Sequence, residues 1–304
     1  MSVGRLSWLE LSVQSPSSIE LGPLLVEGLL VIGGRAIVEA DGWYVTYVEF
    51  PEDVDVFVQR ATETLQAISG TEVPEIRTRR LAHEDWAETW KRGLAARLIT
   101  ERILVRPSWI TAPTNTAQVV DIVIDPGMAF GTAEHGTTRG CLRLLDKVVQ
   151  SGDRVLDVGA GSGILSIAAA LLGAEEVVAI EADLFGFEAL CQNVERNSVT
   201  NRVQCFELDV DAKGIRNFGP VSGVVANIET ETLARLMPGL SGALENGGWL
   251  ILSGIQRKEW PDMQGITERF GLNSIEVDAD GEWRSGLFRT KGEWEPKVKV
   301  PLLT

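Results

Sequence analysis

The chain has 304 residues, with 43 acidic against 28 basic side chains and a formal net charge of −15. This charge disfavours a general nucleic-acid binder or a binder of anionic membranes, and the length suggests two domains. Hydrophobic residues make up 44% of the chain, enough for a large core. The N-terminus lacks the pattern of a signal peptide, and no apolar run is long enough to span a membrane. We therefore expect a cytoplasmic protein.

The cysteines and histidines narrow the possible chemistry. The three cysteines, Cys141, Cys191 and Cys205, are odd in number and show no CxxC spacing. This argues against a disulfide framework or a zinc site and indicates a reducing compartment. Only His83 and His135 are present, so a site with several histidine ligands is excluded, and no metal is expected.

The first 80 residues predict a small α+β domain. Residues 5–14 alternate apolar and polar side chains, as half-buried strands do. Asp41-Gly42 lies between two β-rich runs within 34–50 and indicates a hairpin. With the other segments the order is β-α-β-β-α-β, a ferredoxin-like unit whose role would be recognition or scaffolding. The remaining predictions are helices at 17–30 and 52–68 and a strand at 72–80.

Residues 81–110 resemble a linker with a strand at 102–106, and from residue 119 strands alternate with helices. Such alternation predicts a mainly parallel sheet covered on both faces, in a second domain spanning 111–291. Two further strands flank Asp280-Gly281, and the tail at 292–304 has no clear period. The predicted strands are 119–124, 154–158, 176–181, 202–208, 221–227 and 248–254, and the predicted helices are 137–149, 163–172, 184–197 and 229–244.

A glycine-rich turn is the first sign of a ligand site. The strand VLDV at 155–158 runs into Gly159-Ala-Gly161-Ser-Gly163, and a helix follows. Glycines let the backbone approach a ligand, and the helix start offers unpaired N–H groups, although any tight strand–helix turn favours glycine. Glu181 ends the next strand, where a carboxylate can accept both ribose hydroxyls. These residues together predict a cofactor that contains adenosine.

The spacing of the glycines separates two cofactor classes. Dinucleotide sites use G-x-G-x-x-G, whereas this chain has G-x-G-x-G preceded by Asp157. The pattern resembles motif I of class I methyltransferases, which bind S-adenosylmethionine. Asp209 follows the next strand and either holds the adenine amino group or is a turn residue. Asn227 ends the strand GVVAN, at the mouth of the sheet.

Residues 125–138, the signature segment, carry a more specific resemblance. Their sequence DPGMAFGTAEHGTT resembles DPGLAFGTGTHPTT of the PrmA family, whose members methylate the ribosomal stalk-base protein, number eleven of the large subunit. HEDW at 83–86, RPSW at 106–109, VVANIE and LSGI extend the resemblance over nearly the whole chain. It implies a class I, Rossmann-like domain with a mainly parallel seven-stranded sheet behind a small ferredoxin-like domain.

The resemblance also implies roles for individual residues. Thr138, Gly159 and Gly161 would bind the cofactor, Glu181 the ribose and Asp209 the adenine. Asn227 would lie beside the methyl donor. Phe130 would shield the sulfonium through a cation–π contact, or would pack as an ordinary core residue. His135 is expected to order its own loop by hydrogen bonds rather than to act as a base.

The implied activity is transfer of methyl groups to lysine ε-amines or to the N-terminal α-amine of the stalk-base protein by a monomeric enzyme. Glu134 and Glu229 depart from the family pattern and would add negative charge near the acceptor. Ala133 and Gly136 also depart from the pattern, without a change of charge. The same chemistry on another protein or a small molecule is therefore an alternative. A non-catalytic adenosine-binding module and a nicotinamide dehydrogenase are less favoured.

Overall fold

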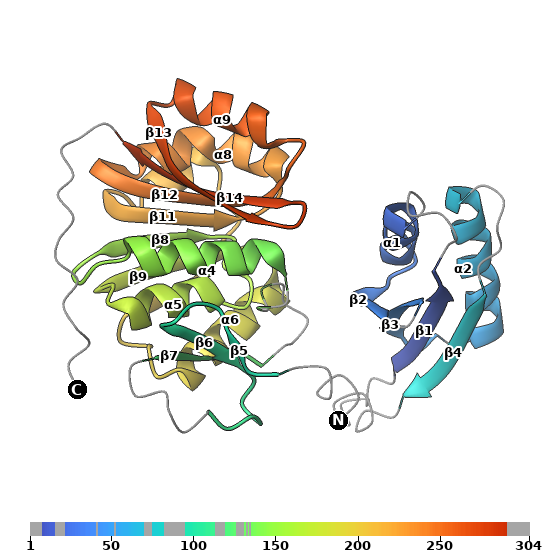
Figure 1. Ribbon diagram of the computed structural model, residues 1–304. Coiled ribbons are helices and arrows are strands. Elements are labelled where there is room, and N and C mark those ends of the chain that lie inside the picture. The colour runs from blue at the N-terminus through green and yellow to red at the C-terminus, as the bar shows by residue number, and fades with distance from the viewer. Residues whose placement is uncertain are drawn as a thin grey trace. The chain divides into compact units, whose positions relative to one another are not determined.

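The computed structural model describes residues 8–15, 22–40, 42–51, 53–69, 75–81, 95–112, 119–125, 131, 133 and 135–290. The chain forms two compact units, Met1–Leu94 and Ala95–Thr304, and each is described by itself (Figure 1). Residues 82–94 of the predicted linker and the predicted tail lie outside the described residues. None of the described helices has the length and apolar character needed to cross a membrane.

The first unit has the predicted β-α-β-β-α-β order, and its four strands form an antiparallel sheet in the order β2-β3-β1-β4. Leu11 and Val13 of β1 pack in one cluster with Leu25 and Leu29 of α1 and with Leu65 of α2. Alternate residues of a strand share one face, so both helices cover the same face of the sheet. The elements are β1 (Trp8–Gln14), α1 (Gly22–Val31), β2 (Arg35–Ala40), β3 (Trp43–Glu49), α2 (Val54–Ser69) and β4 (Ile76–Leu81).

The second unit is built on a seven-stranded sheet in the order β10-β9-β8-β11-β12-β14-β13. The first five strands of this order are parallel, while β14 is antiparallel to both β12 and β13. This confirms the predicted mainly parallel sheet. The strands are β8 (Arg154–Val158), β9 (Glu176–Glu181), β10 (Val203–Glu207), β11 (Val221–Asn227), β12 (Leu244–Gln256), β13 (Leu272–Asp280) and β14 (Trp283–Thr290).

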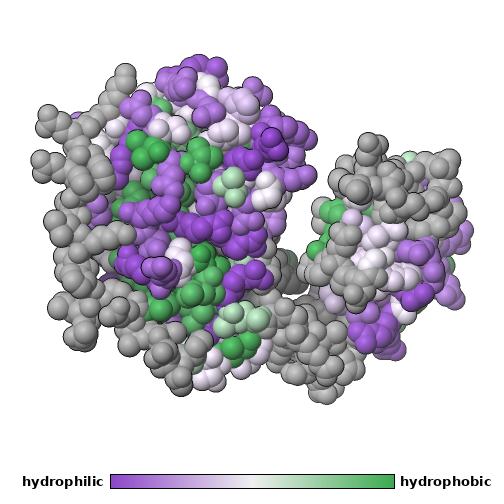
Figure 2. Space-filling view, in the orientation of Figure 1, coloured by the Kyte–Doolittle hydropathy of each residue, from purple (hydrophilic) through white to green (hydrophobic). Residues whose placement is uncertain are grey.

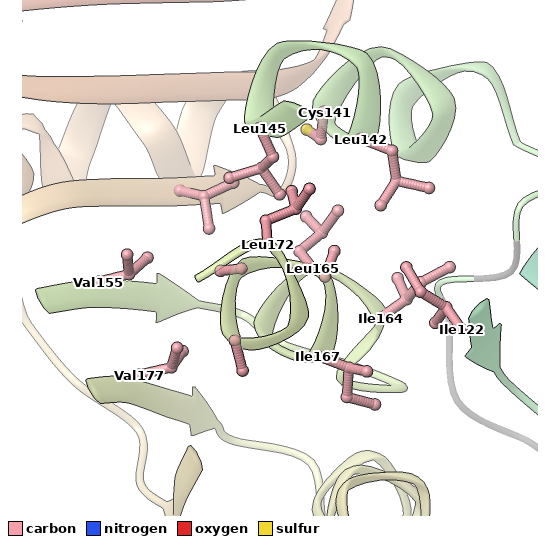
Figure 3. Close-up of a cluster of buried hydrophobic side chains, with 14 of the residues drawn as sticks. Ile122, Cys141, Leu142, Leu145, Val155, Ile164, Leu165, Ile167, Leu172 and Val177 are labelled. Carbon is pink, nitrogen blue, oxygen red and sulfur yellow. The ribbon is translucent and has the colours of Figure 1, made fainter. Parts of the chain in front are cut away.

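Helices cover both faces of this sheet. Val155 of β8 packs in a cluster with α4, α5 and α6 (Figure 3), whereas the adjacent Leu156 packs in a second cluster with α7, α8 and α9. Neighbouring strand residues point to opposite faces, so a strand covered on both sides has a continuous apolar sequence. The helices are α4 (Gly136–Val148), α5 (Ile164–Leu172), α6 (Leu184–Arg196), α7 (Ala212–Arg216), α8 (Thr230–Gly242) and α9 (Trp260–Arg269).

The strand expected at 119–124 is present as β7 (Val120–Val123), but it does not join the seven-stranded sheet. It pairs in parallel with β6 (Ile103–Arg106), which pairs with β5 (Arg97–Leu98), in a separate three-stranded sheet. The Arg106 guanidinium donates to both carboxylate oxygens of Asp121 at 2.7–3.0 Å and links β6 to β7. The helices α7 and α9 were not predicted. Only five residues form α7, and Pro261 and Gly265 within α9 are typical of a loop.

Replacing Gly223 with Ala is expected to destabilise the second unit. A Cβ atom on Gly223 of β11 would lie 2.0 Å from the Trp249 ring, which is buried and donates from Nε1 to Asp153 Oδ2. Overpacking of this kind costs about 1–3 kcal/mol in the free energy of unfolding, measurable by urea denaturation. Gly265→Ala is the control because nothing lies within 4 Å of its Cβ position. In α9 this change is expected to stabilise by about 0.5–1 kcal/mol. Equal stability of the two variants would contradict the packing argument.

Candidate active site

Four neighbouring strands, β10, β9, β8 and β11, end at one edge of the sheet. Their register aligns Glu207 with Glu181, Ile180 with Val158, and Val158 with Ala226. The chain runs outward from β8 in one direction to β9 and β10, and β11 lies on the other side of β8. Such a switch point at the carboxyl ends of parallel strands is where open α/β sheets bind ligands. The predicted residues Asp209, Glu181, Gly159, Gly161 and Asn227 all lie at or just after these strand ends.

The turn between β8 and α5 requires its glycines. Gly159, Gly161 and Gly163 have φ angles of 75°, 53° and 81°, a region that L side chains rarely adopt. A Cβ on Gly159 would also lie 2.5 Å from Cγ2 of Ile228, the residue after β11. A side chain at Gly159 would therefore be strained and would clash with Ile228, and the backbone of the turn closely approaches the end of β11.

Glu181 fastens the glycine turn to the end of β9. Its Oε2 accepts a hydrogen bond of 2.7 Å from the Gly161 N–H, and its Oε1 accepts bonds of 2.9 Å from the N–H groups of Ala182 and Asp183. A carboxylate has about four acceptor positions, and three are used. The remaining capacity of a half-buried carboxylate at this edge fits a ribose hydroxyl.

Asn227 and Thr138 meet across the switch point. Asn227 Nδ2 lies 3.5 Å from Oγ1 of Thr138, which is fully buried in the first turn of α4. Asn227 Oδ1 is buried and has no hydrogen-bond partner among the described residues. An orphaned buried acceptor is costly and marks a place where a bound donor would fit.

The signature segment is held against the glycine turn. Ser162 Oγ donates to the carbonyl oxygen of Gly131, and the Ser162 carbonyl accepts a bond of 2.9 Å from Asn193 Nδ2. At the start of the segment, Asp125 accepts hydrogen bonds from the N–H and hydroxyl of Ser108. Gly131 of this segment therefore lies beside the glycine turn. Phe130 and Glu134 lie outside the described residues, so the role predicted for Phe130 stays a prediction.

A family model described as ribosomal protein L11 methyltransferase (PrmA) matches residues 38–291. The chain belongs to the PrmA family. It is 34% identical over 316 residues to the ribosomal protein L11 methyltransferase of Chloroflexus aurantiacus, covering 91% of this chain and 96% of that protein. It is 40% identical to the protein of that name from Pelotomaculum thermopropionicum, covering 71% of this chain and 69% of that protein. The crystal structure of ribosomal protein L11 methylase from Lactobacillus delbrueckii subsp. bulgaricus matches with a TM-score of 0.57 and 28% identity, covering 64% of this chain and 99% of that chain.

Membership of the PrmA family confirms the resemblance carried by the signature segment and by the G-x-G-x-G turn. The fold is that of class I, S-adenosylmethionine-dependent methyltransferases, and the chain is a protein methyltransferase of that type. Asp209, which was predicted to meet the adenine, is exposed two residues after β10. Glu229, which departs from the family pattern, is exposed directly before α8.

His135 contacts Thr137 within its own loop, as its predicted ordering role requires. Its Nδ1 lies 2.6 Å from Oγ1 of Thr137, and its ring centroid lies 4.8 Å from that of Trp283. Burial lowers the pKa of His135, and the charge of Arg139 lowers it further, against the opposing effect of Asp280. The neutral ring is therefore favoured, and its contacts fix the start of α4.

The sequence drew attention to Asp157 without predicting its burial. This residue of β8 has no exposed surface; its Oδ2 accepts a bond of 2.6 Å from Ser166 Oγ, and its Oδ1 has no partner among the described residues. Burial raises the pKa of Asp157 to about 7, and the nearby charge of Glu181 contributes, although the Ser166 hydroxyl opposes the shift.

This raised pKa predicts the pH dependence of stability. An unfolded aspartate has a pKa of about 3.9, so between about pH 4 and about pH 7 the folded chain binds a proton that the unfolded chain releases. The free energy of unfolding then falls as pH rises, by up to about 1.4 kcal/mol per pH unit. Asp157→Asn removes this fall, so the variant is expected to gain about 4 kcal/mol relative to the original chain across that range.

Urea unfolding at about pH 5 and about pH 8 covers about two of these three pH units, so the advantage of Asp157→Asn should grow by about 2.7 kcal/mol between the two measurements. Asp262→Asn, at an exposed position of α9, is the control and should follow the pH curve of the original chain. Parallel curves for the original chain and Asp157→Asn would show that Asp157 does not titrate in this range.

Proposed function

We propose that this chain transfers methyl groups from S-adenosylmethionine to amine nitrogens of ribosomal protein L11, at lysine ε-amines, the N-terminal α-amine or both. The observation that carries the proposal is the alignment of Gly161, Glu181 and Asn227 at one switch point in a chain of the PrmA family. The acceptor protein is inferred from the name of the relatives, ribosomal protein L11 methyltransferase.

The donor site is proposed from the residues at the strand ends. Gly159 and Gly161 would let the cofactor approach the backbone, Glu181 would accept the ribose hydroxyls, and Asp209 would meet the adenine. Thr138 and Asn227 would line the end where the reactive methyl lies, with Phe130 above it. Bound there, S-adenosylmethionine supplies an electrophilic methyl group on a positively charged sulfur.

Two apolar side chains that the sequence analysis missed support the adenine position. Leu208 is 42% exposed and its N–H donates to the Glu181 carbonyl oxygen at 2.9 Å, and Phe185 at the start of α6 is 49% exposed. Large apolar side chains in water beside a polar edge are typical of a ligand surface. A signal for them was available, since Leu208 is the last residue of the predicted strand at 202–208 and Phe185 follows the predicted strand at 176–181 by four residues.

The chain's own residues act on the acceptor by positioning it. A free lysine amine has a pKa of about 10.4, so its neutral form must be selected. Asn227 Oδ1, buried and without a partner among the described residues, can accept one amine N–H and direct the nitrogen lone pair. His135 is engaged with Thr137, so transfer depends on orientation rather than on a dedicated base.

The first unit is proposed to recognise the protein substrate, and the enzyme is proposed to be a cytoplasmic monomer that binds no nucleic acid directly. Residues 1–80 would form the recognition domain, 81–110 the linker, 111–291 the catalytic domain and 292–304 a tail. A second candidate is the same chemistry on another acceptor. Glu229 favours it, because an exposed carboxylate two residues after Asn227 changes the charge beside the proposed acceptor position.

Intact mass spectrometry of purified ribosomal protein L11, incubated with the chain and S-adenosylmethionine, tests the acceptor. We expect a series of added methyl groups that is absent without cofactor and forms far more slowly with Asn227→Ala. An unchanged mass, with cofactor binding intact by calorimetry, would overturn L11 as the acceptor and favour the second candidate.

A further inference from the structure

Helix α4 and strand β13 face each other with opposite charges. The basic residues lie four apart on the helix and so share one face, and the acidic residues lie two apart on the strand and also share one face. Figure 2 shows mostly hydrophilic residues over the middle of the second unit, where α4 lies. The pairs are Arg139 with Asp280 (2.8 and 2.9 Å), Arg143 with Asp278 (2.7 and 2.8 Å) and with Asp280 (2.9 Å), and Lys147 with Glu276.

Arg139 differs from the other basic residues of this row because it also reaches the signature segment. Its Nη1 donates to the carbonyl oxygen of Ala133 at 3.3 Å, while Nε and Nη2 bind Asp280. The planar guanidinium is suited to several fixed hydrogen bonds at once. One side chain therefore joins the β13–β14 hairpin to the signature segment.

The first turn of α4 also packs closely on this hairpin. A Cβ on Gly136 would lie 3.2 Å from the Asp280 carboxylate and carbonyl oxygens. Ser253 Oγ of β12, buried, donates to the Thr137 carbonyl and lies 2.6 Å from Ser285 Oγ of β14. Thr138, the partner of Asn227, follows directly. The turn that carries Thr138 is thus contacted both by the buried Ser253 and by the Arg139–Asp280 pair.

We propose that Arg139, fixed by Asp280, is a positioning residue that holds Ala133 and Thr138 in the geometry that binds S-adenosylmethionine. The proposal rests on the proposed function, since it assigns the cofactor to this edge. Strand β13 supplies no predicted site residue, yet under this proposal it contributes to the affinity for the cofactor. Arg139 itself touches neither cofactor nor acceptor in this role.

If the Arg139–Asp280 pair only stabilised the fold, the neighbouring Arg143–Asp278 pair would have the same role. Arg143 and Asp278 have side chains that are 27% and 18% exposed, against 21% and 25% for Arg139 and Asp280. The Arg143–Asp278 pair lies one helical turn further from the signature segment and reaches no residue of it in the described part of the chain. Asp278→Asn is therefore a matched control for Asp280→Asn.

The test measures S-adenosylmethionine binding by calorimetry and thermal stability for the full chain and both variants. We expect Asp280→Asn to weaken cofactor binding about tenfold, the loss typical of one displaced hydrogen bond to a charged group. Asp278→Asn should bind the cofactor within about twofold of the original chain. Its thermal midpoint should change by about as much as that of Asp280→Asn. Equal affinities for the two variants would overturn the positioning role.

A charge exchange, Arg139→Asp with Asp280→Arg, gives a second readout. It can restore an ion pair between α4 and β13, but an aspartate at 139 cannot donate to the Ala133 carbonyl. We expect recovered stability without recovered affinity, and recovery of both would contradict the proposal. If the original chain bound no S-adenosylmethionine, the proposed function itself would fail, which is a different result from equal affinities of the variants.

Discussion

Replacing Glu181 with Ala is expected to lower the affinity for S-adenosylmethionine by about 10- to 100-fold. The Glu181 carboxylate holds the Gly161 N–H at 2.7 Å and is the proposed acceptor for the ribose hydroxyls. Its removal loses a charged hydrogen-bond acceptor and releases the glycine turn at the same time. Isothermal titration calorimetry measures the dissociation constant directly.

Two further variants separate these causes. Glu181→Asp keeps the carboxylate on a side chain one methylene shorter, so it should bind within about fivefold of the original chain. Glu176→Ala changes the same residue type at the opposite end of β9, where Glu176 pairs with Arg154 at 2.8 Å. That control should leave the affinity unchanged. Equal binding by Glu181→Ala and Glu176→Ala would exclude the ribose role.

Replacing Asn227 with Ala is expected to lower kcat for methyl transfer by about 100-fold, the usual effect of misplacing a reacting group. The dissociation constant for the cofactor should change far less, by less than about tenfold. The reason is that Asn227 Oδ1 is proposed to orient the amine, whereas the glycine turn and Glu181 supply most of the cofactor contacts. Single-turnover kinetics with L11, followed by intact mass, measure the methyl-transfer step.

Asn217→Ala is the control for this experiment. Asn217 is exposed and lies before the amino end of the same strand, β11, away from the switch point. It should transfer methyl groups at the original rate. A kcat for Asn227→Ala equal to that of the control would remove Asn227 from the reaction, and a loss confined to cofactor affinity would make it a binding residue only.

The local parts of the fold were predictable because short-range chemistry determines them. The hairpin at Gly42 needs a positive φ angle, here 80°, and its sequence signal was clear. The glycines of the turn after β8 have the left-handed φ angles that only glycine adopts easily. The continuous apolar sequences of β8 and β11 indicated strands covered on both faces, and the structure confirms this.

The parts that depend on distant partners were not predictable in the same way. The apolar pattern of β7 reports that it is buried, but it does not report that its partner is β6 rather than the main sheet. Asp278 and Asp280 resembled ordinary solvent-exposed acids in a hairpin, and only the fold places them against Arg139 and Arg143. The burial of Asp157 likewise depends on the helices that cover both faces of the sheet at β8.

The candidate site shows the same division. Glu181, Gly161 and Asn227 were predicted because each ends or follows a recognisable strand, and parallel strands bring their carboxyl ends together. The orphaned Asn227 Oδ1 and the hydrogen bond from Gly161 to Glu181 could not be predicted, since both depend on atomic positions across neighbouring strands.

A crystal structure of the chain with S-adenosylhomocysteine, the product left after methyl transfer, tests the position of the cofactor most directly. We predict the ligand across the carboxyl ends of β9, β8 and β11, with its ribose hydroxyls bonded to Glu181 and its sulfur near Asn227. A ligand bound elsewhere in the chain, or at this edge without contact to Glu181, would contradict the proposed active site.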